Sequence, residues 1–287
     1  MSDALTELLE LLDLEQLEVN LFRGVSPDEQ RQRVFGGQVA GQALVAAGRT
    51  VETDRTVHSL HAYFLRPGDP NVPIIYNVDR IRDGRSFTTR RVVAIQHGRA
   101  IFNLAASFQI IEDGPEHQYE MPDAGDPEVL PSFLERVTPY RDRFSEEVWD
   151  WISRERPITT RSVEAPRWID PSPRPAEQHV WFKSNGPLPA NSLLHKCVVA
   201  YASDLTLLDT AVMPHQVSYT DDSFQIASLD HAMWFHRSFH VDEWMLYHQK
   251  SPSAHGARGI AEGFIYSQDG RLCVTVIQEG LLRPVVR

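Results

Sequence analysis

One pattern occurs twice along this chain, and it constrains the fold more than any other feature of the sequence. A helix of mainly apolar residues is followed by four strand-like segments, and the whole arrangement is then repeated. The first copy is expected at residues 36–50, His58–Leu65, Ile74–Arg82, Ser86–His97 and Ile101–Ile110. The second copy is expected at Ala190–Val212, Phe224–Arg237, Glu243–Ser251, Ala257–Ser267 and Arg271–Gly280. The pattern predicts two copies of one helix-plus-sheet unit.

Short segments of similar sequence occur in the same order in both copies and support the repeat. They are Ser59-Leu60 with Ser228-Leu229, Phe64-Leu65-Arg66 with Phe235-His236-Arg237, Gly84-Arg85 with Ala257-Arg258, and Gly98-Arg99 with Gly270-Arg271. Counting onward from the last match, Ala106 in the first copy corresponds to Gln278 in the second.

The segment between the two copies has a different character. Residues 112–189 are rich in proline and contain helix-like stretches at Leu130–Val137 and Ser145–Ser153. Near the start of the chain, leucines at helical spacing predict a helix over Asp3–Leu14. We therefore expect an N-terminal unit at 1–111, a linker that leads into the second unit at 112–189, and a C-terminal unit at 190–287.

Composition narrows the classes of partner and compartment. The 287 residues carry a net charge of −11, which argues against nucleic acid and anionic membranes as main partners. No apolar run is long enough to span a membrane, and the N-terminus lacks the features of a signal peptide. Cys197 and Cys273 each lie in an apolar run and form no CxxC pair, so we expect buried thiols and a cytoplasmic location.

Three polar side chains interrupt apolar surfaces of the second copy. Gln278 shares a strand face with Leu272, Val274 and Val276, because alternate residues of a strand point the same way. A buried amide without partners costs about 1–3 kcal/mol, so Gln278 is either a structural tether or part of a site. The apolar counterpart of Gln278, Ala106, favours the site.

Asp204 and Ser228 extend this observation to the expected helix and a neighbouring strand. Asp204 lies on or near the apolar stripe of the helix, where a charged side chain needs a partner. Ser228 shares a strand face with Phe224 and Ile226. Each residue alone can be explained as a satisfied structural polar group. Together, a carboxylate, a hydroxyl and an amide can bind and orient a single water molecule.

Several segments resemble the acyl-CoA thioesterase II (TesB-type) family from about Leu14 to Arg283. They are Phe35-Gly36-Gly37-Gln38, His58–Asp69, Arg82–Phe87, Tyr201–Leu205, Ser228–Arg237 and Val276–Arg283. The resemblance implies an α+β double hot-dog fold and a catalytic aspartate, threonine and glutamine, which fall on Asp204, Ser228 and Gln278. Serine replaces the usual threonine at position 228, which retains the hydroxyl and loses the methyl group that restricts its rotamer.

The resemblance predicts hydrolysis of fatty acyl-CoA by a water that Asp204 activates and that Ser228 and Gln278 orient. Basic groups are then needed for the CoA phosphates, and Arg237, Arg258 and Arg271 are candidates that ion pairs explain equally well. The resemblance also implies a homo-oligomer, either a dimer or a tetramer. No cofactor is expected.

Two alternatives remain open. A hot-dog enoyl-CoA hydratase typically has a histidine five residues after its aspartate, and position 209 here is Asp. The second alternative is a protein that binds acyl-CoA without catalysis. A nucleophilic α/β-hydrolase is disfavoured because the sequence has no GxSxG motif.

The sequence gives little support for a catalytic histidine or for a metal site. His58 lies in the copy without the polar trio, so we expect a structural role for it. The spacing of His231, His236 and His240 does not bring them together on a strand, and no HExxH motif occurs. We therefore expect no metal site.

Overall fold

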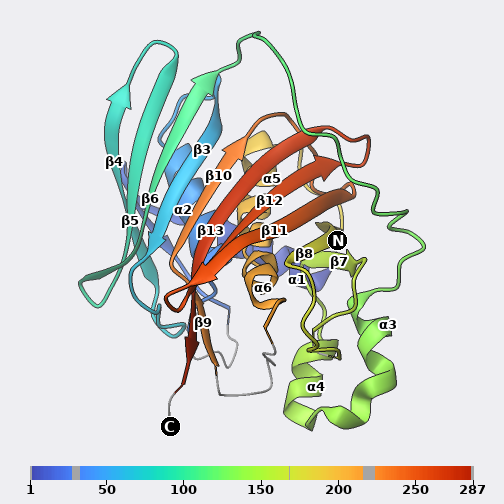
Figure 1. The fold of residues 1–287 in the computed structure, drawn as a ribbon. Helices are drawn as coiled ribbons and strands as arrows, with labels where there is room; N and C mark the ends of the chain where they lie inside the picture. The colour runs from blue at the N-terminus through green and yellow to red at the C-terminus, as the bar shows by residue number, and fades with distance from the viewer. Residues whose placement is uncertain (1, 28–32, 168, 216–223, 286–287) are drawn as a thin grey trace.

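The computed structural model describes residues 2–27, 33–167, 169–215 and 224–285, and its strands form one continuous antiparallel sheet (Figure 1). The first half contributes β1 (Glu15–Glu18), β2 (Leu21–Gly24), β3 (Arg55–Phe64), β4 (Ile74–Asp83), β5 (Phe87–Gln96) and β6 (Arg99–Ile110). The second half contributes β7 (Ile158–Ser162), β8 (Glu177–Ser184), β9 (Phe224–Ser228), β10 (Asp230–Phe235), β11 (Met245–His255), β12 (Arg258–Ser267) and β13 (Leu272–Pro284).

The helices are fewer than the strands and include the two predicted by the repeat. They are α1 (Asp3–Leu12), α2 (Gly36–Gly48), α3 (Phe133–Val137), α4 (Glu146–Ser153), α5 (Ser192–Ser203) and α6 (Leu207–Val212), with a 3-10 turn at Thr138–Arg143. Helices α2, α5 and α6 lie behind the curved sheet in Figure 1, and the main hydrophobic core lies between them and the strands. We call the side of the sheet that faces these helices the inner face. This arrangement is the double hot-dog fold that the repeat and the resemblance predicted.

The two halves share a seam of main-chain pairing between β3 and β10. Leu60 lies opposite Met233, and the antiparallel register extends from Ser59–Trp234 to Tyr63–Asp230. The strand order β1-β2-β4-β5-β6-β3-β10-β13-β12-β11-β8-β7 therefore crosses from one half to the other without a break, and β9 pairs with β13 beside it. The domain boundaries at residues 111 and 189 stay a prediction.

Glycines allow the two central helices to pack closely. A Cβ atom on Gly41 of α2 would lie 3.1 Å from the Cys197 carbonyl oxygen of α5, and one on Gly37 would overlap the Tyr201 carbonyl oxygen. The helices run in opposite directions, so this contact brings the N-terminus of α2 next to the C-terminus of α5.

The expected single helix over Ala190–Val212 is wrong, because the chain leaves helical geometry at Asp204–Thr206 and starts again as α6. The side-chain amides of two glutamines in the sheet stabilise this break in the helix. Gln178 Nε2 donates to the Thr206 carbonyl oxygen at 3.0 Å, and Gln249 Nε2 donates to Thr206 Oγ1 at 2.6 Å. The break places Asp204 at a helix end instead of on the side of a long helix.

The expected single strand over Phe224–Arg237 is also wrong. It divides at Leu229 into β9 and β10, which pair with β13 in registers that differ by one residue. The backbone of Leu229 is still hydrogen-bonded to both neighbouring strands. Its N–H donates to the Glu279 carbonyl oxygen, and its own carbonyl oxygen accepts from the Phe64 N–H. A one-residue shift of this kind changes the direction of nearby side chains, here those next to Ser228.

The segment after β6 runs along the outer face of the second-half strands, as Figure 1 shows in green. Trp181 Nε1 donates to the Ala124 carbonyl oxygen at 3.2 Å, and the ring of Tyr119 lies against that of Phe264. The sequence analysis missed β1 and β2 at one end of the sheet, and β7 and β8, which extend the other end beyond β11. No helix in the part of the chain that the structure describes is long and apolar enough to cross a membrane.

The packing under β12 gives a test of the fold. A Cβ atom on Gly263 would overlap the ring of Tyr247, which is buried and donates its hydroxyl to the Ser203 carbonyl oxygen. We expect Gly263→Ala to lower the free energy of unfolding by about 1–3 kcal/mol, measured by chemical denaturation, because the core is overpacked. Gly114→Ala, where the new Cβ would have no neighbour within 4 Å, is the control and should stay within about 0.5 kcal/mol of the parent. Equal effects of the two changes would contradict this packing.

Candidate active site

The structure brings Asp204, Ser228 and Gln278 together from three elements. Asp204 caps the C-terminus of α5, Ser228 ends β9, and Gln278 lies on the inner face of β13. Ser228 Oγ donates to Asp204 Oδ1 at 3.0 Å, and Gln278 Nε2 donates to the same oxygen at 2.5 Å. The predicted trio therefore converges on one carboxylate oxygen.

A third donor comes from the other half of the molecule. The N–H of Gly37, in the first turn of α2, also hydrogen-bonds the Asp204 carboxylate. A Cβ atom on Gly36 would lie 2.7 Å from Asp204 Oδ2, so a side chain there would collide with the carboxylate. The sequence analysis gave these glycines no role, although two consecutive glycines at a helix start are a signal for close approach of another group. The N-terminus of α2 also favours a negative charge through the helix dipole.

Gln278 is only partly satisfied by these contacts. Its side chain is fully buried, and its Oε1 atom has no hydrogen-bond partner among the described residues. The Nε2 atom is used by Asp204, which fixes the orientation of the amide and leaves Oε1 as a buried acceptor. A group used only as a tether would not leave an acceptor unpaired at a cost of about 1–3 kcal/mol. Gln278 Oε1 is therefore a buried acceptor with unused hydrogen-bonding capacity next to Asp204.

The first half has an apolar counterpart of this site. Ser228 pairs with Gly280, two residues after Gln278, and Val57 pairs with Phe108, two residues after Ala106. Val57 and Ala106 thus occupy the positions that Ser228 and Gln278 occupy in the second half, so the sequence match of Ser59 with Ser228 is wrong by two residues. The three polar side chains therefore belong to the second half, and the first half contributes the Gly37 N–H.

Burial has a measurable consequence for the carboxyl group. Desolvation raises the pKa of Asp204 to about 6, against the opposing effect of the hydrogen bonds from Gln278, Ser228 and the Gly37 N–H. The carboxyl group is therefore mostly ionised at neutral pH and close enough to its pKa to accept a proton. A base with a pKa near the working pH is suited to general base catalysis.

The arginines considered for CoA have partners on the protein. Arg237 donates to the Leu272 carbonyl oxygen at 2.9 Å, and Arg66 makes the equivalent bond to Ala100 at 2.6 Å in the first half. Arg258 pairs with Glu279, and Arg271 pairs with Asp269. The repeated Arg66 and Arg237 bonds favour a structural role for that motif, and the other two are exposed ion pairs.

His58, His231 and His236 lie in separate environments. His58 Nε2 hydrogen-bonds Ser107 Oγ at 2.8 Å, and His236 Nε2 hydrogen-bonds Thr275 Oγ1 at 2.8 Å. His231 is buried and hydrogen-bonds Ser203, the residue before Asp204, at 2.8 Å. His231 therefore supports the end of α5 that carries the carboxylate.

Comparisons with known proteins identify the class. Residues 160–281 match the family model described as acyl-CoA thioesterase, and residues 26–109 match the model described as acyl-CoA thioesterase N-terminal domain. The chain belongs to the acyl-CoA thioesterase II (TesB-type) family of thioester hydrolases.

Individual relatives resemble the chain over nearly its whole length. It is 42% identical to acyl-CoA thioesterase 2 of Haemophilus influenzae over 99% of both chains. It is 43% identical to acyl-coenzyme A thioesterase 8 of Mus musculus over 95% of this chain and 88% of that one. Among solved structures, TesB2 of Mycobacterium marinum is 45% identical, with a TM-score of 0.79 over 97% of this chain and 98% of that one.

The raised pKa predicts a pH profile for acyl-CoA turnover. If Asp204 is the base for this reaction, kcat/KM should fall as the pH drops through about 6, because the carboxyl group becomes protonated. Ser228→Ala removes a donor that favours the ionised form, so it should raise this pKa and move the acidic limb to higher pH. The profile is measured from kcat/KM over a pH series. A limb that stays in place or moves to lower pH in Ser228→Ala would contradict the assignment.

Proposed function

We propose that this protein hydrolyses acyl-CoA thioesters to a fatty acid and CoA, with Asp204 as the general base. The observation that carries the proposal is the convergence of Ser228, Gln278 and the Gly37 N–H on one buried carboxylate, next to the unpaired Gln278 Oε1. The family relationship supports the class of reaction, since the relatives are named acyl-CoA thioesterases.

In the proposed mechanism a water molecule binds between Asp204 and Gln278. One O–H donates to the Asp204 carboxylate, which takes that proton as the oxygen attacks the thioester carbonyl carbon. The other O–H donates to Gln278 Oε1, and the Ser228 hydroxyl fixes the carboxylate that accepts the first proton. These contacts contribute to the rate mainly by orienting the nucleophile.

The charge that develops on the carbonyl oxygen needs donors, and the first turn of α2 supplies them in this proposal. The N–H groups at a helix start have no intrahelical acceptor, and the N-cap residue Phe35 offers no side-chain acceptor to them. Collapse of the tetrahedral intermediate expels a thiolate. Since thiols have a pKa of about 8.5, this leaving group needs little help from an acid.

An apolar cluster next to the trio is the proposed contact surface for the acyl chain. Leu208 of α6 packs on Gly280, where an added Cβ would overlap the leucine side chain. The cluster continues over Leu282 and the partly buried Ile226, which lies two residues before Ser228. An apolar chain bound here would have its thioester close to Asp204.

Release of CoA, followed with a thiol reagent across short, medium and long acyl chains, tests the activity. We expect Asp204→Asn to lower kcat by a factor on the order of 10² or more, because the base is lost. The variant should be no less stable than the parent at neutral pH. Because burial raises the pKa of Asp204 from 3.8 to about 6, the carboxyl group costs stability as the pH rises through that window, and the full cost is present at neutral pH. Near-normal turnover in a folded Asp204→Asn variant would overturn the role of this residue.

The hydroxyl at position 228 has its own matched pair of variants. Ser228→Ala loses the bond to Asp204 and should lower kcat about tenfold, whereas Ser228→Thr keeps the hydroxyl and should stay within a few fold of the parent. Equal losses in both variants would show that packing, and not the hydroxyl, is what matters. Absence of CoA release at every chain length would favour the acyl-CoA binder, and hydration of crotonyl-CoA would favour the hydratase.

A further inference from the structure

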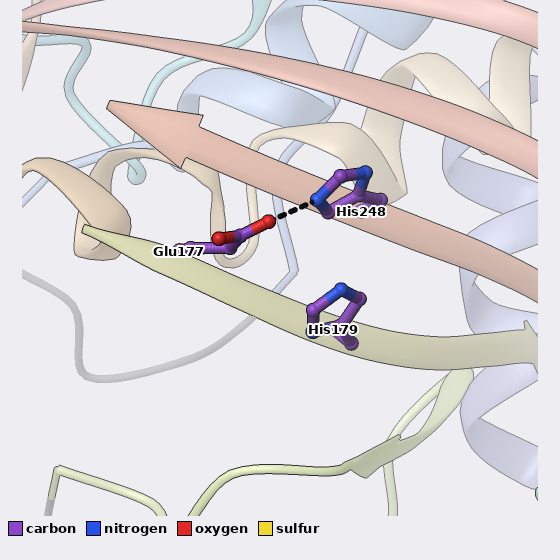
Figure 2. A group of neighbouring side chains, drawn as sticks. All are labelled: Glu177, His179 and His248. Carbon is purple, nitrogen blue, oxygen red and sulfur yellow. Dashed lines mark hydrogen bonds and ion pairs between the residues drawn. The ribbon is translucent and has the colours of Figure 1, made fainter. Parts of the chain in front are cut away.

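The outer face of the second-half sheet carries two histidines and a glutamate that face one another, as Figure 2 shows. Glu177 and His179 are two residues apart on β8, so their side chains lie on the same face. His248 of β11 lies directly opposite His179 in the antiparallel register. Two residues of one strand and one of its neighbour thus project to the same place.

We propose that Glu177, His179 and His248 bind a divalent cation of the zinc class. One potential ligand atom from each residue lies within 4.8 Å of the other two. Two imidazole nitrogens and one carboxylate oxygen are a ligand set that zinc accepts, with the fourth position left to water. The side chains come from paired strands of the sheet, which fixes their backbone positions.

A fourth residue, Glu164, orients the His179 ring so that one of its nitrogens can bind a metal ion. Glu164 Oε1 lies 2.9 Å from His179 Nδ1, and Glu164 Oε2 accepts the His179 backbone N–H at 2.8 Å. The carboxylate therefore holds the proton on Nδ1 and leaves the Nε2 lone pair of His179 available. Metal-binding histidines usually donate their second ring N–H to a carboxylate in this way.

The second histidine needs a small adjustment. The two imidazole rings lie 4.7 Å apart and are nearly parallel, at 5°. A metal ion lies in the plane of each ring that binds it, so one ring must turn about its Cβ–Cγ bond. In the proposal His248 is the ring that turns: its Nε2 atom lies 2.7 Å from Glu177 Oε1, and an ion bound between them takes the place of the proton in that hydrogen bond.

The local charge favours a cation. Glu164 contacts His179 and Glu177 contacts His248, and among the described residues Lys250 is the cation paired with this cluster, with its Nζ 3.3 Å from Glu177. Two carboxylates against one ammonium group leave a net negative charge when both histidines are neutral. Lys250 competes with the ion for Glu177, and its half-exposed side chain can move into solvent.

A second histidine cluster lacks these features. His195, His240 and Asp242 also come together, but His195 Nδ1 accepts the Val241 N–H at 3.1 Å. That hydrogen bond requires the ring proton to be on Nε2, so neither nitrogen of His195 has a free lone pair. The geometry points to the β8–β11 cluster instead.

The proposed site is independent of catalysis. It lies on the outer face of β11, whereas Tyr247 and Gln249 of the same strand point to the helices. Glu164 follows β7, so an ion would tie the edge of the sheet to the chain beyond it. The expected effect is on stability, because a ligand that binds only the folded state raises Tm by mass action.

Isothermal titration of the untagged full chain with Zn²⁺ tests the proposal. We expect about one site per chain, with a rise in Tm on addition of Zn²⁺. His179→Gln and His248→Gln should abolish the saturable site and the Tm shift. Glu164→Gln, which removes only the orienting carboxylate, should weaken binding by about 10–100-fold. Lys250→Met removes the competing cation and should tighten binding several-fold.

A histidine elsewhere on the surface and the rate of CoA release serve as controls for the binding measurements. His97→Gln changes an exposed histidine that also contacts a carboxylate, Asp69, and should leave binding unchanged. All variants should release CoA at the parent rate, which also shows that they are folded. Absence of saturable binding in the parent chain would overturn the proposal. So would loss of binding in His240→Gln with retention in His179→Gln, and so would unchanged affinity in both Glu164→Gln and Lys250→Met.

Discussion

The close contact of α2 with α5 is the constraint on which the rest of the molecule depends. Glycines on α2 let the two helix backbones approach without side chains between them. This approach carries the Asp204 carboxylate from the end of one helix to the first turn of the other, where the Gly37 N–H binds it. The site is therefore built from both halves, although every side chain of the trio comes from the second.

The two halves keep one backbone plan and differ in chemistry. Where the second half has Ser228 and Gln278, the first has Val57 and Ala106. In the first half the backbone at that position binds Lys196 of α5, whose Nζ donates to the Val57 carbonyl oxygen at 3.1 Å and to Thr56. Burial lowers the pKa of Lys196 to about 8, so this contact is a buried polar link between the halves. At this position the first copy therefore forms a contact between the two halves, and the second copy contributes residues of the proposed active site.

Periodicity and turn residues were enough to predict the repeat and most strands, and the family resemblance was needed to group Asp204, Ser228 and Gln278 as one site. Local sequence could not show the break after Asp204, because Gln178 and Gln249 hold Thr206 from distant strands. It also could not show the outer-face cluster, because only the strand register brings His248 beside His179. The division at Leu229 depends in the same way on which residues of β13 each strand meets.

The seam between β3 and β10 has a consequence for how the chain folds. Its paired residues are far apart in sequence, so it is a non-local contact of the kind that slows folding. As the chain leaves the ribosome, β3 can pair with β6 but has no partner on its other side until β10 follows. During that interval the first half presents an open strand edge, the kind of surface that promotes aggregation. Completion of the second half therefore protects the first half as well as forming the site.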